Sequence, residues 1–268
     1  MKSSEIIKKR VSVRTFKDTG IAREDREILG DTLKESTNPF GIPIEYHFLD
    51  GKKDKVSSMV VKGAETYVAG KCKKVPHAEE AFGYEFEKFM LKATELGVGT
   101  VFLAGTINRK AFEAAMAVGE DEVLFAVTPL GYPAEKRSVR ESVMRKSLGS
   151  DKRLPFEKVF FKDNFSQPLA EDVRYALPLE MVRSAPSATN KQPWRLVVCD
   201  NKIHFFERKT KGYSNEKTGD IQKVDMGIAM AHFELGAEEA DMHGEWKIED
   251  PGIACDADTE YIVTFAVM

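Results

Sequence analysis

The sequence has few cysteines and no large excess of charge of either sign. Its three cysteines, Cys72, Cys199 and Cys255, are far apart, odd in number and form no Cys-x-x-Cys pair. This usage argues against a disulfide framework or a zinc site and suits a reducing compartment. The formal net charge of −3 gives no electrostatic reason to expect a nucleic-acid or membrane partner.

Long apolar runs are also missing. No stretch approaches the roughly 20 apolar residues that a membrane span needs, and the first residues, MKSSEIIKKRVSVRTF, lack the apolar core of a secretory signal. Hydrophobic residues make up 42% and charged residues 31% of the chain, which is typical of globular rather than disordered proteins. The sequence therefore predicts a soluble cytoplasmic protein.

Helical and strand-like stretches alternate along the chain. From Glu79 to Leu96 the apolar residues recur at three- and four-residue steps, which predicts a helix with one face on a core. Glycines at 97 and 99 end this helix. The other expected elements of the first half are helices at 23–36 and 109–118 and strands at 44–49, 64–70 and 122–133.

The second half of the chain repeats the order of the first. Residues 16–18 and 161–163 both read Phe-Lys-Asp, and strand-like segments follow at Tyr46 and Trp194. A three-residue match is weak by itself, but helices and strands surround both copies in the same order. Repeats of this size predict two similar subdomains. We place them at 1–150 and 151–268.

A basic motif lies near the start of the chain. Arg10, Ser12 and Arg14 alternate, and alternate side chains of an extended chain share a face. Two guanidinium groups and a hydroxyl on one face suit a phosphate, because arginine can donate two parallel hydrogen bonds. An exposed basic tail explains these residues equally well. A second basic cluster could converge on the same phosphate: Lys136, Arg137, Arg140, Lys152 and Arg153.

Two further segments favour a flat ligand. In ELGVGTVFLAG, Gly99 and Gly105 allow the backbone to approach a ligand closely with its N–H groups exposed, while a helix C-cap explains Gly97. The segment PSATNKQPW places short hydrogen-bonding side chains on a loop between two prolines: Ser187, Thr189, Asn190 and Gln192.

These segments together resemble the nitroreductase family of flavoproteins. An ordinary member carries all of them in one shorter unit and binds FMN at the interface of a homodimer. Here the first half lacks P-S-x-x-N and the second half lacks R-x-S-x-R, so the chain resembles a fused, single-chain branch with one FMN per polypeptide. The matching segments are R-x-S-x-R (10–14), L-G-x-G-T with a small-residue loop (96–105), a strand ending in Gly-Tyr-Pro (131–133), and P-S-x-x-N-x-Q-P-W (186–194).

The resemblance implies both a fold and contacts to FMN. The fold would be α+β, with two tandem degenerate repeats of antiparallel-type sheets and flanking helices that form an intramolecular pseudo-dimer, monomeric in solution. Arg10, with Lys152 or Arg153, would hold the phosphate, and Ser12 and Arg14 would bond the ribityl chain or the pyrimidine carbonyls. The other expected contacts are a small-residue loop facing the hydride-exchanging nitrogen and a loop of the second half bordering the ring: Leu103, Ala104, Gly105, Pro186, Ser187, Ala188 and Asn190.

The resemblance also implies an activity. NAD(P)H would reduce FMN and leave, and a nitroaromatic, quinone or similar small-molecule acceptor would take its place. The flavin carries this chemistry, so we expect no catalytic side chain and no metal. His204, His232 and His243 are expected to be structural, and Trp194 to pack beneath its loop. Dehalogenation or flavin destruction on the same fold, a non-catalytic flavin-binding module, and a basic-patch binding protein without flavin remain alternatives.

Overall fold

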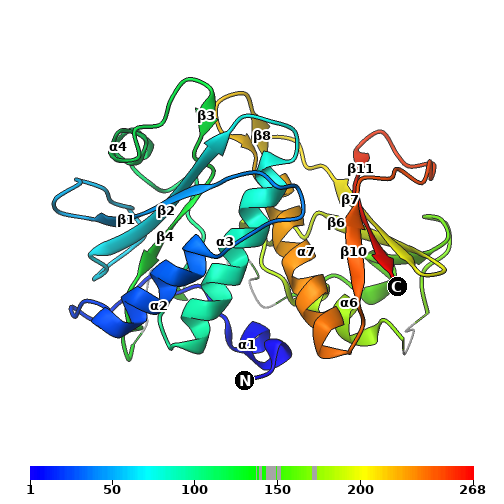
Figure 1. Cartoon of the computed structure of the whole chain (residues 1–268), viewed down its shortest axis with the longest axis horizontal. Coiled ribbons are helices and arrows are strands. Elements are labelled where there is room, and N and C mark those ends of the chain that lie inside the picture. The colour runs from blue at the N-terminus through cyan, green and yellow to red at the C-terminus, as the bar shows by residue number, and fades with distance from the viewer. Residues whose placement is uncertain (137, 139–140, 143–148, 150–151, 171–173) are drawn as a thin grey trace.

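The computed structural model of the protein describes residues 1–136, 138, 141–142, 149, 152–170 and 174–268. Two β-sheets lie on opposite sides of a central pair of long helices, α3 (Ala78–Glu95) and α7 (Ile221–Glu239), which pack against each other (Figure 1). Within the described residues, no helix is long and apolar enough to cross a membrane.

The first sheet is antiparallel and has β2 at its centre. Its strands are β1 (Glu45–Asp50), β2 (Thr66–Lys73), β3 (Glu122–Val123) and β4 (Val127–Leu130). β1 pairs with one edge of β2, whereas β3 and β4 pair with its other edge. Besides α3, the described part of this unit contains the helices α1 (Ser3–Lys9), α2 (Arg23–Lys34) and α4 (Arg109–Ala115).

The second sheet has the order β10-β11-β7-β6-β5. Its pairs are antiparallel except for β5 and β6, which are parallel. The strands are β5 (Phe160–Lys162), β6 (Trp194–Cys199), β7 (Lys202–Arg208), β10 (Gly244–Lys247) and β11 (Thr259–Val267). The remaining elements of this unit are η1 (Phe156–Lys158), α6 (Ala176–Ser184), η2 (Ala188–Asn190), β8 (Ser214–Asn215) and β9 (Gly219–Asp220).

The two units share one topology. In each, a hairpin leads into a long helix, and a later strand returns to the second strand of the hairpin: β1-β2-α3-β4 in the first unit and β6-β7-α7-β11 in the second. This is the α+β arrangement of tandem units that the sequence predicts. The expected boundary falls between residues 150 and 151, which are outside the described residues, so that division stays a prediction.

One predicted strand is divided in two. The apolar run at 122–133 suggests a single buried strand, but residues 124–126 separate β3 from β4. The guanidinium group of Arg109 donates to the carbonyl oxygens of Leu124 at 2.6 Å and Phe125 at 3.2 Å. Because a side chain satisfies these carbonyls, the backbone there needs no strand partner.

The central helices approach each other backbone to backbone. A Cβ atom at Gly83 of α3 would lie 2.0 Å from the carbonyl oxygen of Val224, and one at Gly227 of α7 would lie 2.0 Å from that of Glu80. The two contacts are reciprocal, since each helix presents its glycine to the backbone of the other. The crossing holds the N-terminal parts of α3 and α7 together, and both helices contribute residues to the site described next.

Candidate functional site

A cavity of about 320 Å³ lies between the two units. Of the expected FMN contacts, all except Lys152 line it. The first unit contributes Arg10, Ser12, Arg14, Leu103, Ala104 and Gly105, and the second contributes Arg153, Pro186, Ser187, Ala188 and Asn190. The structure therefore brings two segments together, near residues 10 and 190, that are far apart in the sequence.

The R-x-S-x-R segment runs along the cavity in an extended conformation. Arg10 follows the last residue of α1 and has extended backbone angles. The N–H group of Val13 donates to the carbonyl oxygen of Thr100 at 2.9 Å, and Val13 is buried. Arg10, Ser12 and Arg14 line the cavity together with Val11, while Val13 packs inward.

A buried carboxylate holds Arg10 in place. The side chain of Arg10 is 8% exposed, and its Nε lies 3.4 Å from Oε1 of Glu87, which is fully buried in α3. Nε2 of His232 in α7 lies 2.8 Å from the same oxygen. Nδ1 of His232 lies 2.9 Å from the carbonyl oxygen of Met181, and it must carry a proton because a carbonyl can only accept. Glu87 and His232 thus fix the guanidinium group from both long helices.

The glycine loop after α3 has one open position. Gly97 has a φ of +75° and caps the helix, as expected. A Cβ atom at Gly99 would lie 3.0 Å from the side chain of Val13, whereas one at Gly105 would meet no atom within 4 Å. The N–H group of Leu103 donates to Val127 at 2.9 Å. Protein packing therefore explains Gly99 but not Gly105.

The P-S-x-x-N loop is fixed to α7. The N–H group of Ala188 donates to both carboxylate oxygens of Asp225, at 3.0 and 3.1 Å. Asp225 is 3% exposed and lines the cavity, and burial raises its pKa well above the usual range. Thr189 has a φ of 48°, which is uncommon for a β-branched residue, and its hydroxyl is hydrogen-bonded to that of Tyr213.

Asn190 connects this loop to the preceding connector. Its Nδ2 donates to the carbonyl oxygens of Gly149 at 2.8 Å and Lys152 at 3.0 Å. Nη2 of Arg153 donates to Ser184 at 3.1 Å, and Arg153 lines the cavity. Of the two cations considered for the phosphate, Arg153 is therefore the one at the cavity. In the second basic cluster, Lys136 does not line the cavity either, and Arg137 and Arg140 are outside the described residues.

Residues that the sequence assigned to packing behave differently from one another. Trp194 is fully buried and does not line the cavity, as expected. His204 is buried beside Thr264, and His243 lies at the surface beside Asp241. His232, in contrast, contacts Glu87, and Glu87 contacts Arg10. Sequence reasoning missed Glu87, His232 and Asp225, because only the helix crossing brings them to the site.

The cavity combines cations with apolar walls. Three arginines reach it, and the start of α7 adds apolar side chains to those of the glycine loop. Such a lining suits a ligand with an anionic end and a flat apolar body, because each kind of surface finds a matching partner. The apolar residues are Val11, Val60, Val101, Phe102, Leu103, Ala104, Ala126, Pro186, Ala188, Ile221, Val224 and Ile228.

Comparison with known proteins identifies the family. The family model described as "Putative TM nitroreductase" matches residues 2–237. A crystal structure from Thermotoga maritima, named a putative nitroreductase (tm1586), has a TM-score of 0.60 and 21% identity, and the match covers 100% of this chain and 94% of that one. A comparison with curated proteins found no match.

Other solved structures resemble about half of the chain. An FMN-dependent nitroreductase from Clostridium difficile has a TM-score of 0.43 and 18% identity over 50% of this chain and 88% of that one. An iodotyrosine deiodinase bound to FMN and 3-iodo-L-tyrosine has a TM-score of 0.43 and 17% identity over 51% of this chain and 92% of that one. The family model and the full-length fold match together show that the chain belongs to the TM nitroreductase family and has a nitroreductase fold.

Proposed function

We propose that the protein is an FMN-dependent oxidoreductase that uses NAD(P)H to reduce small-molecule acceptors such as nitroaromatics or quinones. Membership of a nitroreductase family supports an oxidoreductase. The observation that carries the proposal is the convergence of residues 10–14 and 186–190 on one cavity between the units. In this proposal the units act as a pseudo-dimer, and each supplies a different part of one site.

The residues present fit FMN on three counts. Arg10 and Arg153 come from different units and line the same cavity, so they can hold a phosphate together. The apolar walls suit an isoalloxazine ring. Gly105 leaves open space on its Cβ side, and within the described residues the N–H groups of Ala104 and Gly105 donate no hydrogen bond. These two groups can therefore meet a polar edge of the ring.

In this proposal the residues that line the cavity bind and orient FMN. Arg10, anchored by Glu87, and Arg153 bind the phosphate, while Ser12 and Arg14 bond the ribityl chain or the pyrimidine edge. The loop at 186–190 borders the ring and is kept in place by Asp225. FMN, when bound, supplies the hydride-transfer chemistry. The protons that reduction of the acceptor takes up would come from solvent, so no side chain of the protein needs to transfer one.

A visible spectrum tests the function. We expect the purified protein, alone or after addition of FMN, to show flavin absorbance that stays with the protein on gel filtration. Under anaerobic conditions NADH or NADPH should bleach this absorbance, and a quinone or nitroaromatic should restore it. Bound flavin that neither nucleotide reduces would point instead to a non-catalytic flavin-binding module. A protein that remains colourless with added FMN contradicts the proposal altogether.

Gly105→Ala separates ligand binding from stability. A Cβ atom there meets no protein atom, so the melting temperature should stay within about 2 °C of the parent's. If the backbone at 105 contacts the flavin, the added methyl group should weaken FMN binding about tenfold or more, because overpacking a contact typically costs about 1–3 kcal/mol. Gly20→Ala is the matched control, since its Cβ would also meet nothing and Gly20 does not line the cavity. Equal FMN affinity in both variants would place the flavin away from Gly105.

A further inference from the structure

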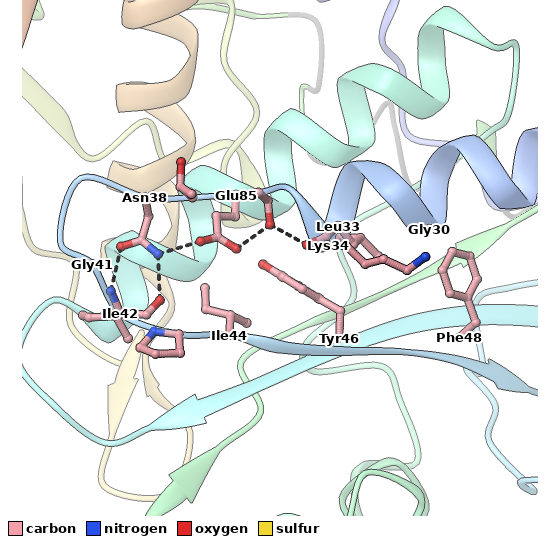
Figure 2. Close-up of a pocket in the computed structure, with 13 residues that line it drawn as sticks. Gly30, Leu33, Lys34, Asn38, Gly41, Ile42, Ile44, Tyr46, Phe48 and Glu85 are labelled. Carbon is pink, nitrogen blue, oxygen red and sulfur yellow. Dashed lines mark hydrogen bonds between the residues drawn. The ribbon is translucent and has the colours of Figure 1, made fainter.

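The first unit has a cavity of its own where the second unit has its P-S-x-x-N loop. The segment ESTNPFGIPIEYHFL at 35–49 precedes and forms β1, as PSATNKQPW precedes β6. It lines a cavity of about 560 Å³ between α2, β1 and α3 (Figure 2). This second cavity shares no lining residue with the first. Its volume is within the range of small-molecule sites in proteins.

The polar end of this cavity is a buried carboxyl group. Glu85 is 4% exposed. Its Oε1 accepts a hydrogen bond from Nδ2 of Asn38 at 2.6 Å, and its Oε2 accepts one from the hydroxyl of Ser36 at 2.9 Å (Figure 2). Both donors are neutral, and among the described residues no cation lies within salt-bridge distance of Glu85. Burial raises the pKa of Glu85, and the hydrogen bonds from neighbouring side chains and the charge of Lys88 offset this effect only in part.

A tyrosine hydroxyl lies beside this carboxyl group. The Tyr46 side chain points its hydroxyl toward Glu85 (Figure 2). The hydroxyl oxygen is buried, and its interaction with Glu85 lowers the pKa of that carboxyl group, against the larger effect of burial. The ring is held by stacking on Phe86, with centroids 5.9 Å apart. This end of the cavity therefore offers a ligand two neighbouring polar groups, the carboxyl group of Glu85 and the hydroxyl oxygen of Tyr46.

The rest of the cavity is mainly apolar. Leu33, Ile42, Ile44 and Phe48 form its walls. The one cationic side chain in the lining, Lys34, is largely exposed and paired with Asp31 at 2.8 Å. No arginine lines this cavity, and a buried carboxylate repels phosphate, so the chemistry here is opposite to that of the first cavity. The lining therefore does not fit a second FMN.

We propose that this cavity binds a small organic ammonium ion with an apolar body. The ammonium group would donate hydrogen bonds to Glu85 and to the oxygen of Tyr46, and so supply the counter-ion that Glu85 lacks. The apolar body would lie against the isoleucines and Phe48, whose rings and alkyl groups it would shield from water. The proposal does not depend on the function of the first cavity, because the two sites have separate linings.

Methyl NMR with benzylammonium as the probe tests this proposal. Ile42 and Ile44 line the second cavity, whereas Ile221 and Ile228 line the first, so isoleucine-labelled, FMN-saturated protein reports on both sites at once. We expect saturable shifts at Ile42 and Ile44 only. Benzyl alcohol, which has the same ring but no charge, should bind at least tenfold more weakly. No binding, equal binding of the alcohol, or shifts confined to Ile221 and Ile228 would each overturn the proposal.

Substitutions of Glu85 and Tyr46 test whether these side chains bind the ammonium group. Glu85→Gln should weaken benzylammonium binding at least tenfold, because it removes the charge and keeps the shape. Tyr46→Phe should weaken it about threefold or more, because it removes the hydroxyl oxygen, together with its interaction with Glu85, and leaves the ring in place. Glu95→Gln, at a half-buried position on the same helix that does not line the cavity, should leave the binding unchanged. If Glu85→Gln does not fold, Tyr46→Phe decides. Unchanged affinity in the folded variants would refute the assignment.

Discussion

Gly227→Ala is expected to lower the free energy of unfolding by at least about 3 kcal/mol, or to prevent folding. An alanine in a helix is ordinarily about 1 kcal/mol better than a glycine. At this position the added Cβ would lie 2.0 Å from the carbonyl oxygen of Glu80 and 2.7 Å from the backbone nitrogen of Tyr84. Neither backbone atom can rotate away, so α7 would have to move off α3, and the contacts along the whole crossing would loosen.

A matched substitution gives the opposite sign. Gly30 lies inside α2, and a Cβ there would meet only the ring of Phe48, at 3.9 Å. Gly30→Ala should therefore raise the stability by about 0.5–1 kcal/mol through helix propensity alone. Urea denaturation followed by circular dichroism measures both. Equal stability of Gly227→Ala and the parent would mean that the two helices do not cross at backbone contact.

The sequence predicts the parts of the fold that depend on periodicity. The apolar spacing from Glu79 to Leu96 matches the position of α3, but the helix is buried on more than the one face that the spacing predicts. The order of elements in each half also matches, since hairpins, helices and returning strands have recognisable residue patterns. The helix crossing is different. The sequence does not show whether a glycine within a helix packs against another backbone or is simply a small residue. The contact of Gly83 with Val224 was therefore not predictable.

Local hydrogen bonding accounts for the fold prediction that was wrong. The run at 122–133 predicts one strand, because its residues 123–127 are consecutive apolar residues with no polar interruption between them. The division between β3 and β4 depends on Arg109, which satisfies two carbonyls from outside the sheet. The parallel pairing of β5 with β6 is equally hidden, since three residues of β5 carry too little pattern to give a direction.

The candidate site was predictable through its motifs and not through its supports. The resemblance pointed to segments that the fold does bring to one cavity, although their contact with FMN stays a prediction. It left Lys152 and Arg153 as equal candidates, because neighbouring residues point apart and only the fixed backbone decides between them. Asp225 and Glu87 belong to none of the motifs. Each contacts a motif residue on another element: Asp225 contacts Ala188, and Glu87 contacts Arg10.

Arg10→Met is expected to weaken FMN binding at least a hundredfold. Two charge-assisted hydrogen bonds to a phosphate, each worth about 1.5–3 kcal/mol, exceed the roughly 2.7 kcal/mol that a hundredfold represents. Fluorescence titration of the apoprotein with FMN measures the loss. Lys152→Met is the matched control. It also removes one positive charge, but Lys152, which precedes Arg153 in the sequence, does not line the cavity. FMN affinity should change about twofold at most in that variant.

Arg10→Met also acts on stability, and this must be separated from its effect on binding. Without the guanidinium group, the fully buried Glu87 faces only His232. Removal of one partner from a buried ion pair costs about 3–5 kcal/mol. The double variant Arg10→Met, Glu87→Gln removes both charges and should recover most of that stability. Its FMN affinity should stay as low as that of Arg10→Met, because the phosphate ligand is still missing.

Glu87→Gln alone shows whether Glu87 positions Arg10. Arg10 keeps its charge in this variant but loses the carboxylate oxygen that lies 3.4 Å from its Nε. The guanidinium group must then be ordered when FMN binds, at a cost of about 1–1.5 kcal/mol, so the affinity should fall about tenfold. An affinity equal to the parent's would show that Arg10 needs no anchor. Recovery of FMN binding in the double variant would show more: Arg10 would then support the fold and not the phosphate, and the site would have to be assigned again around Arg153 and Arg14.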